Sequence, residues 1–166
     1  MEQGDHYAKL RPPPPTPAEE LCACPDTPPI KLMYALSANP IHCMDCNREV
    51  APEGLRLSAS QVDAVAFWCW IHAAIDHLWL ASSEYEQWAQ KQLSDISSPV
   101  CRLGRQAQAE LNATRRCYYW YFQDQTADNH APLNNCPLCG LPLTGYTAGI
   151  FLQRVCEACS IVVSAE

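Results

Sequence analysis

Residues 136–160 read CPLCGLPLTGYTAGIFLQRVCEACS and contain two Cys-x-x-Cys pairs, Cys136/Cys139 and Cys156/Cys159. Each pair is typical of a tight knuckle that points both sulfurs at one centre, and Gly140 directly follows the first pair. Two knuckles joined by a hairpin supply four thiolates at about 2.3 Å around a tetrahedral zinc ion. Because four thiolates saturate the ion, the pattern predicts a structural zinc ribbon and not a catalytic metal.

A second set of cysteines lies upstream of the first. Cys22 and Cys24 form a Cys-x-Cys pair, and eighteen residues separate it from the Cys-x-x-Cys pair of Cys43 and Cys46. This arrangement is close to a second ribbon in which one knuckle is shortened. Three interpretations fit it: all four cysteines bind a second zinc ion, Cys43 and Cys46 bind one with His42 or another ligand, or the thiols are free. The sequence thus predicts one zinc ion and allows a second.

Cysteine content and charge limit the compartment and the partners. Eleven cysteines in 166 residues would suit a secreted disulfide scaffold, but residues 1–15 contain no apolar segment of the kind that a secretory signal needs. We therefore expect a cytoplasmic protein whose cysteine pairs bind metal.

The formal net charge is -7, and a zinc ion with four thiolates adds about two further negative charges. Such a protein should repel nucleic acid and attract basic partners.

Residues 58–113 are expected to be helical. Ser58 to Gln61 has the pattern of a capping box, and residues 62–80 are apolar on nearly every face, which favours a helix buried at the centre of the fold. That stretch also contains Asp63 and Asp76, so it is a poor transmembrane span and we expect no membrane contact. A second capping-box pattern starts at Ser83, and a third helix is expected over residues 100–112.

Short strands are expected on either side of these helices. Residues 30–36 and the aromatic run 115–123 both have compositions that favour strands. The predicted fold class is α+β, with a small helical core of about three helices, short antiparallel strands and one or two zinc ribbons. The predicted organisation is a disordered proline-rich tail over 1–20, a strand-rich segment with candidate zinc knuckles over 21–57, a helical core with the aromatic strand over 58–132, and the C-terminal zinc ribbon over 133–166.

Two weaker signals point to other kinds of site. His72 lies three residues after Cys69 on one predicted helix, so an enzyme with a Cys–His pair is conceivable, although a buried structural cysteine is the more typical interpretation. Arginines and aromatic residues also gather over 99–122, as in proteins that bind single-stranded nucleic acid; the arginines are Arg102, Arg105, Arg115 and Arg116. Because alternate rings of a strand face opposite ways, at least one set belongs in the core.

Three segments of the chain together resemble a known family. They are YALSANPIHCMDCNREV (34–50), RRCYYWYFQD (115–124) and the closing CPLCG…VCEACSIVVS (136–164). The chain resembles an uncharacterised bacterial family that is described as zinc-ribbon-containing and possibly nucleic-acid-binding. The resemblance spans roughly 30–166. It implies zinc at Cys136, Cys139, Cys156 and Cys159 and a role for Cys43 and Cys46, and it implies no known activity.

The expected function is non-enzymatic binding of a basic protein partner. Closed metal sites, an acidic composition and the lack of a catalytic constellation all favour it. One specific form is an immunity-type protein that neutralises a basic bacterial toxin. The alternatives are a nucleic-acid-binding zinc-ribbon protein and an enzyme that uses Cys69 and His72.

Overall fold

A computed structural model describes residues 14–126 and 130–166 of the chain. The expected tail over 1–20 therefore lies largely outside the described residues, and within it only Ala18–Glu20 forms a regular element, a short 3₁₀ helix. A second 3₁₀ helix spans Pro52–Leu55. The other elements are β1 (Ile30–Leu32), β2 (Ile41–Cys43), α1 (Ala59–Ala81), α2 (Glu86–Ser94), α3 (Pro99–Asn112), β3 (Cys117–Trp120), β4 (Thr144–Tyr146), β5 (Gln153–Cys156) and β6 (Ile161–Ser164).

All six strands join one mixed sheet, in the order β2-β1-β3-β6-β5-β4. The pairs β1/β3 and β3/β6 are parallel, and the other three pairs are antiparallel. The prediction of a small helical core with short antiparallel strands is therefore wrong, although the mixed α and β content is right. The physical reason is that parallel pairing joins segments that lie far apart in the chain: residues 33–116 separate β1 from β3. Local sequence patterns do not indicate such pairing.

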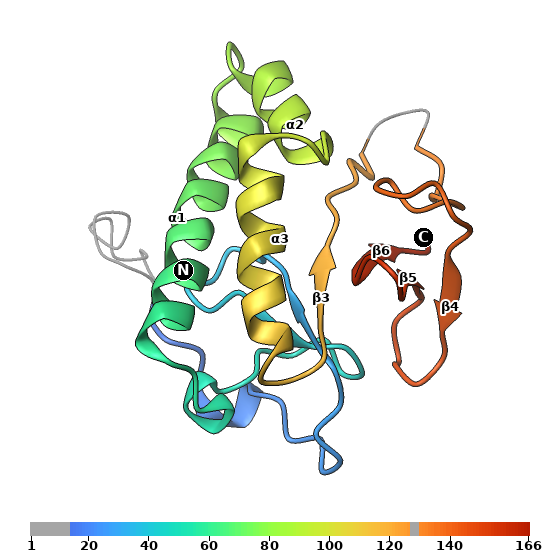
Figure 1. Cartoon of the computed structure of the whole chain (residues 1–166). Coiled ribbons are helices and arrows are strands. Elements are labelled where there is room, and N and C mark those ends of the chain that lie inside the picture. Colours follow the sequence, from blue (N-terminus) through green and yellow to red (C-terminus); the bar gives the residue numbers. More distant parts are fainter. Residues whose placement is uncertain (1–13, 127–129) are drawn as a thin grey trace, which may run out of the picture.

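The helices cover only part of this sheet. In Figure 1, α3 lies between α1 and β3, and β4 to β6 lie on the far side of β3, away from the helices. α3 contacts β3 and β1 directly, while α1 packs against α3 and α2. The main core lies between these helices and the strands, and Leu32, Trp68, Leu111 and Tyr119 are all buried in it. The strand 117–120 is thus confirmed as a core strand.

Helix α1 begins as predicted but is not buried on all sides. Ser58 accepts a hydrogen bond from the Gln61 backbone N–H, and the Gln61 side chain accepts one from Ser58 in return, so the capping box is present. The buried face includes Trp68 and Cys69, whereas Phe67 is 51% and Trp70 is 70% exposed. The expectation of a central buried helix is wrong. By length and composition alone, α1 would also be able to cross a membrane.

The capping box expected at Ser83 is not formed. The residue that precedes α2 is Tyr85, which provides no side-chain cap, and Ser83 adopts a left-handed backbone conformation with φ of 56°. The third helix, Pro99–Asn112, begins one residue before the expected range, because Ser98 caps it and Pro99 occupies its first turn.

The second face of the sheet carries a smaller core. Alternation along β3 sends Tyr119 toward the helices and Tyr118 to the other side. There Tyr118 packs with Met44, Val155 and Val162. Met44 belongs to the Cys43–Cys46 knuckle, so this knuckle covers the face that the helices leave open.

The close contact of α3 with its neighbours yields a stability prediction. A Cβ atom at Gly104 would lie 2.4 Å from Tyr119 Cε2 and 2.6 Å from Trp68 Nε1. Gly104→Ala should therefore lower the free energy of unfolding by about 1–3 kcal/mol in urea titrations of the zinc-loaded protein, although alanine favours a helix. The matched control is Gly54→Ala, where a Cβ would meet nothing within 4 Å. Equal stability of the two variants would contradict this packing.

Candidate metal centres

The three Cys-x-x-Cys pairs share one local backbone geometry. The residue after the second cysteine is left-handed in each, with φ of 60° at Asn47, 74° at Gly140 and 52° at Ser160. The Asn47 N–H donates to Cys43 O at 3.0 Å, and the Gly140 N–H donates to Cys136 O at 2.9 Å. Asparagine and glycine tolerate this conformation best. The turn folds each pair so that its two sulfurs face the same centre.

The C-terminal cysteines form one four-sulfur centre. The sulfurs of Cys136, Cys139, Cys156 and Cys159 all lie within 4.8 Å of one another. The Sγ atoms of Cys139 and Cys156 are 3.6 Å apart, and a tetrahedral ion with bonds of about 2.3 Å requires about 3.8 Å. The Leu138 N–H also donates to Cys136 Sγ at 3.4 Å. The donor set and its spacing fit zinc.

The upstream cysteines form a second centre of the same kind. The sulfurs of Cys22, Cys24, Cys43 and Cys46 also lie within 4.8 Å of one another. The Cys22 N–H donates to Glu49 O at 2.7 Å, which ties the shortened Cys-x-Cys pair to the chain beyond the knuckle. His42 is outside this group: its register partner is Lys31 on β1, so it projects to the opposite face from Cys43. Of the three interpretations above, the structure assembles the four-cysteine set.

Within each set the thiols are not equivalent. The Leu141 backbone N–H and the neighbouring thiols donate to Cys139 and lower its pKa to about 7. Burial opposes ionisation of Cys46, but the Arg48 backbone N–H and its three neighbouring thiols outweigh it and lower the pKa of Cys46. Burial raises the pKa of Cys43 and that of Cys156. Each set therefore includes one cysteine, the second of a Cys-x-x-Cys pair, whose pKa is lowered by a backbone N–H and neighbouring thiols.

The two centres are joined by direct contacts. Asp45, in the upstream knuckle, accepts a hydrogen bond from the Tyr146 hydroxyl at 2.6 Å, and its carbonyl accepts one from the Ile150 N–H at 2.9 Å. The Gln153 side chain donates to Met44 O at 3.0 Å. Tyr146 and Gln153 belong to β4 and β5, the hairpin that leads to Cys156. The upstream knuckle thus rests on the hairpin of the C-terminal ribbon.

The three cysteines outside the two four-cysteine sets lie in surroundings typical of structural residues. Cys69, Cys101 and Cys117 are all buried. Burial raises the pKa of Cys69 to about 11 and lowers the pKa of His72 to about 4. The Cys69 thiol faces Ala38 O at 3.9 Å, and the His72 ring packs against Tyr34 and Trp68. A thiol and an imidazole that both remain neutral, without a hydrogen bond to each other in the described residues, lack the features of an activated nucleophile.

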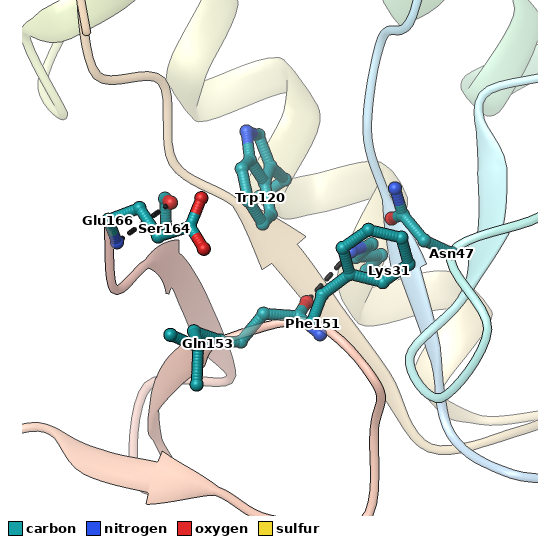
Figure 2. Close-up of a pocket in the computed structure, with 8 residues that line it drawn as sticks. Lys31, Asn47, Trp120, Phe151, Gln153, Ser164 and Glu166 are labelled. Carbon is teal, nitrogen blue, oxygen red and sulfur yellow. Dashed lines mark hydrogen bonds between the residues drawn. The ribbon is translucent and has the colours of Figure 1, made fainter.

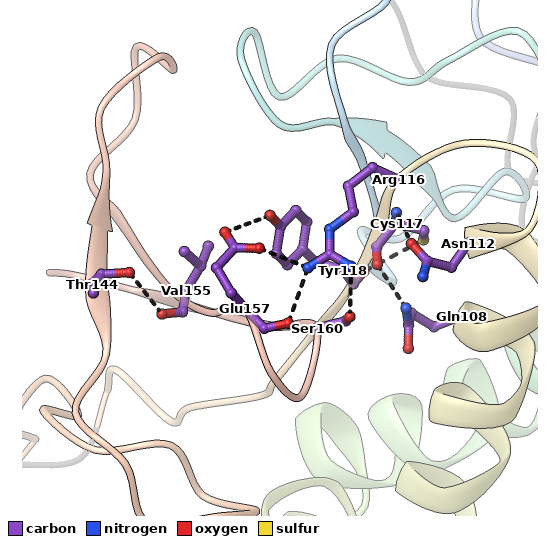
Figure 3. Close-up of polar contacts among 9 residues, drawn as sticks. All are labelled: Gln108, Asn112, Arg116, Cys117, Tyr118, Thr144, Val155, Glu157 and Ser160. Atoms are coloured by element: carbon purple, nitrogen blue, oxygen red, sulfur yellow. Dashed lines mark hydrogen bonds and ion pairs between the residues drawn. The ribbon is translucent and has the colours of Figure 1, made fainter.

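Two of the four arginines are held by the fold. Arg115 Nε donates to Pro28 O at 2.7 Å. Arg116 donates to Glu157 at 2.7 Å and to Ser160 Oγ at 3.1 Å, and it lies over the Tyr118 ring (Figure 3). The Tyr118 hydroxyl donates to the same Glu157 carboxylate at 2.8 Å. This network ties β3 to the Cys156–Cys159 knuckle and pairs the charge of Arg116 within the fold.

No protein-family model, no curated protein and no solved structure matches this chain. The resemblance to the zinc-ribbon family therefore stays a prediction.

Sequence reasoning missed one residue with an unusual environment. Lys31 is 1% exposed, in the middle of β1. Its Nζ donates to Gln153 Oε1 at 2.7 Å and lies 4.6 Å from the centroid of the Trp120 ring. Burial lowers the pKa of Lys31 to about 8, which still leaves it mostly charged at pH 7. The available signal was a lone lysine within an apolar strand sequence, Ile30-Lys31-Leu32.

The first prediction for the metal centres concerns metal content. Because each set gathers four sulfurs within 4.8 Å of one another, protein purified without chelator should contain about two zinc ions per chain by elemental analysis. Cys46→Ser and Cys139→Ser should each lose one of the two ions. Cys69→Ala, a substitution outside both sets, should retain both. A well-folded chain without zinc would contradict the assignment of either centre.

The second prediction concerns the contact between the centres. Tyr146→Phe removes the hydroxyl that donates to the Asp45 carboxylate, so the free energy of unfolding of the zinc-loaded protein should fall by about 1.5–3 kcal/mol, as for hydrogen bonds to charged groups. Tyr85→Phe serves as the control. The Tyr85 ring is exposed, so removal of its hydroxyl should lower the free energy of unfolding by less than about 0.5 kcal/mol. If both variants unfold at the same urea concentration, the contact does not stabilise the fold.

Proposed function

We propose that this chain is a non-enzymatic, zinc-stabilised protein that binds a basic protein partner through the exposed face of α1. The observation that carries the proposal is an apolar surface on a helix whose other side is already packed. Phe67, Trp70, Ile71 and Ala74 are all exposed. They follow each other at intervals of three, one and three residues, so they lie on one face of the helix.

The composition of this face favours a protein as its occupant. Exposed aromatic residues are the side chains that most often anchor protein interfaces, because each buries a large area on binding. Two large rings, Phe67 and Trp70, lie one turn apart at its centre. Single exposed apolar residues are common on soluble proteins, but several on one helix face indicate an interaction surface.

Charge favours a basic partner. The net charge of the chain is -7, and Asp63 occupies the same helix face one turn before Phe67. Complementary charge around an apolar patch would accelerate association and reject acidic proteins. An immunity-type protein that neutralises a basic bacterial toxin is one specific form of this proposal. A protein of that type would act in the cytoplasm.

A membrane is the main competing occupant of the same face. By length and composition alone, α1 is long and apolar enough to cross a membrane. Helices that lie on membranes usually carry lysine and arginine beside the apolar face, whereas Ala59–Ala81 contains neither and has two aspartates. An acidic protein is also repelled by anionic lipid. These properties favour a protein over a bilayer.

Two other functions receive less support. The nucleic-acid alternative depends on arginines of which Arg115 and Arg116 already bond Pro28 and Glu157. The enzyme alternative depends on Cys69 and His72, which are buried in the core beneath α1. Arg102 is exposed and Arg105 is half-buried, so only part of the arginine set remains available to a nucleic acid, and the Cys69 and His72 pair is enclosed by the fold.

Site-specific photo-crosslinking tests the proposal in the cells that make the protein. A photoreactive phenylalanine analogue at Ile71 should capture one predominant protein, and the same analogue at Leu141, an exposed residue of the C-terminal ribbon, should not. The captured protein should then bind the purified chain with an association rate that falls as salt concentration rises. Loss of capture at both positions, or equal capture at both, would contradict the proposed surface.

Substitutions then separate the competing functions. Phe67→Ala with Trp70→Ala should weaken binding of the captured protein at least tenfold, because central aromatic residues contribute most to such interfaces. Leu141→Ala is the matched control and should leave affinity and zinc content unchanged. The proposal fails if the double variant instead loses binding to vesicles of neutral lipid, or if Arg102→Ala with Arg105→Ala abolishes oligonucleotide binding at physiological salt.

A further inference from the structure

A cavity on the sheet face opposite the helices combines a buried cation, unpaired polar groups and an apolar mouth. Its volume is about 80 Å³, and it opens to solvent. Four neighbouring strands each contribute one side chain: Lys31 from β1, Trp120 from β3, Ser164 from β6 and Gln153 from β5. Figure 2 shows these side chains around a common space. Because they stand on the sheet itself, their positions are fixed by strand pairing and not by loops.

The cation in this cavity has no carboxylate partner. Within the described residues Lys31 forms no ion pair with an Asp or Glu, and its Nζ donates to Gln153 Oε1 and lies over the Trp120 ring. An ammonium group has three N–H donors, so at least one remains for another acceptor. The thiols of Cys43 and Cys46 favour the charged form of Lys31, and Glu166 also lines the cavity. The N–H donors of Lys31 that remain can bind an anionic group within the cavity.

Two further polar groups can contact the same ligand. Ser164 Oγ accepts a hydrogen bond from the Glu166 N–H at 3.2 Å, which leaves its own O–H free to donate. Asn47 Oδ1 is buried and has no hydrogen-bond partner, although Asn47 lines the cavity. A ligand with an N–H donor can satisfy this acceptor. The site thus offers donors to an anion and an acceptor to an N–H group.

The mouth of the cavity is apolar. Phe151 and Leu152 line it, and both are exposed, while the Trp120 ring forms part of the wall. A ligand that satisfies all of these groups has a carboxylate, an adjacent N–H and an apolar side chain. That chemistry is shared by N-acylated apolar amino acids and by the C-terminal residue of a peptide.

We propose that the cavity bounded by Lys31, Asn47, Trp120 and Ser164 binds the carboxylate of an N-acylated apolar amino acid, either as a free molecule or at the C-terminus of a peptide. Lys31 and the Ser164 hydroxyl hold the carboxylate, Asn47 Oδ1 accepts the N–H, and Trp120 with Phe151 contacts the apolar side chain. This site is separate from the exposed face of α1, which lies on the other side of the sheet.

Calorimetric titration of the zinc-loaded full chain tests the proposal. The probes are N-acetyl-L-phenylalanine, its carboxamide, and the peptide acetyl-Gly-Gly-Phe with a free C-terminus. The two acids should bind, and the carboxamide should bind at least tenfold more weakly, because it lacks the charge that pairs with Lys31. Preference for the peptide by tenfold or more would identify a peptide C-terminus as the source, and equal affinity would identify the free amino acid. Failure of both acids to bind, or equal binding of acid and carboxamide, would overturn the proposal.

Variants assign the binding to this cavity. Lys31→Met should weaken binding of the acids at least tenfold, while Lys91→Met, the same change on the exposed surface of α2, should have no effect. Ser164→Ala should weaken binding a few-fold with zinc content unchanged, and Glu166→Gln should strengthen it by removing a negative charge from the rim. Lys31 could instead serve only as a counter-charge to the thiolates of Cys43 and Cys46. In that case Lys31→Met would lose zinc, and the Ser164 and Glu166 variants would bind the acids as the parent protein does, which would refute the site.

Discussion

Strands of three or four residues are too short to hold a sheet together, and in this protein the cysteine centres take over that task. Isolated short hairpins are at best marginally stable in water. Here β2 ends at Cys43 and β5 ends at Cys156, so each centre includes the end of one strand of the six-stranded sheet. Each set gathers four sulfurs within 4.8 Å. Because the binding free energy of such a metal site is also folding free energy, the rest of the structure depends on these two constraints.

Because side chains alternate along each strand, the short sheet contributes buried residues on both of its faces. Ile30 and Cys43, which pair across β1 and β2, belong to the core beneath the helices, whereas Lys31 between Ile30 and Leu32 points to the other side. The knuckle that carries Cys43 also covers that second face, since Met44 packs on Tyr118 and its carbonyl accepts from Gln153. Metal binding, strand pairing and the shape of the cavity around Lys31 are therefore linked through a few residues.

The two proposed binding surfaces lie on opposite sides of this sheet and differ in chemistry. The exposed face of α1 is apolar, with the rings of Phe67 and Trp70 upon it, and suits a large partner. The cavity is small, with a buried ammonium group at its base, and suits a single terminal group. Neither surface uses a zinc ligand. The cysteines stabilise the sheet, whereas the residues proposed to contact other molecules are not members of the cysteine sets.

The sequence by itself determined the cysteine knuckles, the capped start of α1, the aromatic core strand and the acidity, because each depends on residues close together in the chain. It left the Cys22–Cys24 pair ambiguous and missed Lys31 as a feature. Only the tertiary structure decided that all four upstream cysteines converge, that β1, β3 and β6 pair in parallel, and that one face of an apolar helix stays exposed. The physical reason is that strand pairing and helix burial depend on contacts between distant segments, and an all-round apolar helix has no periodicity that marks which side the core will cover.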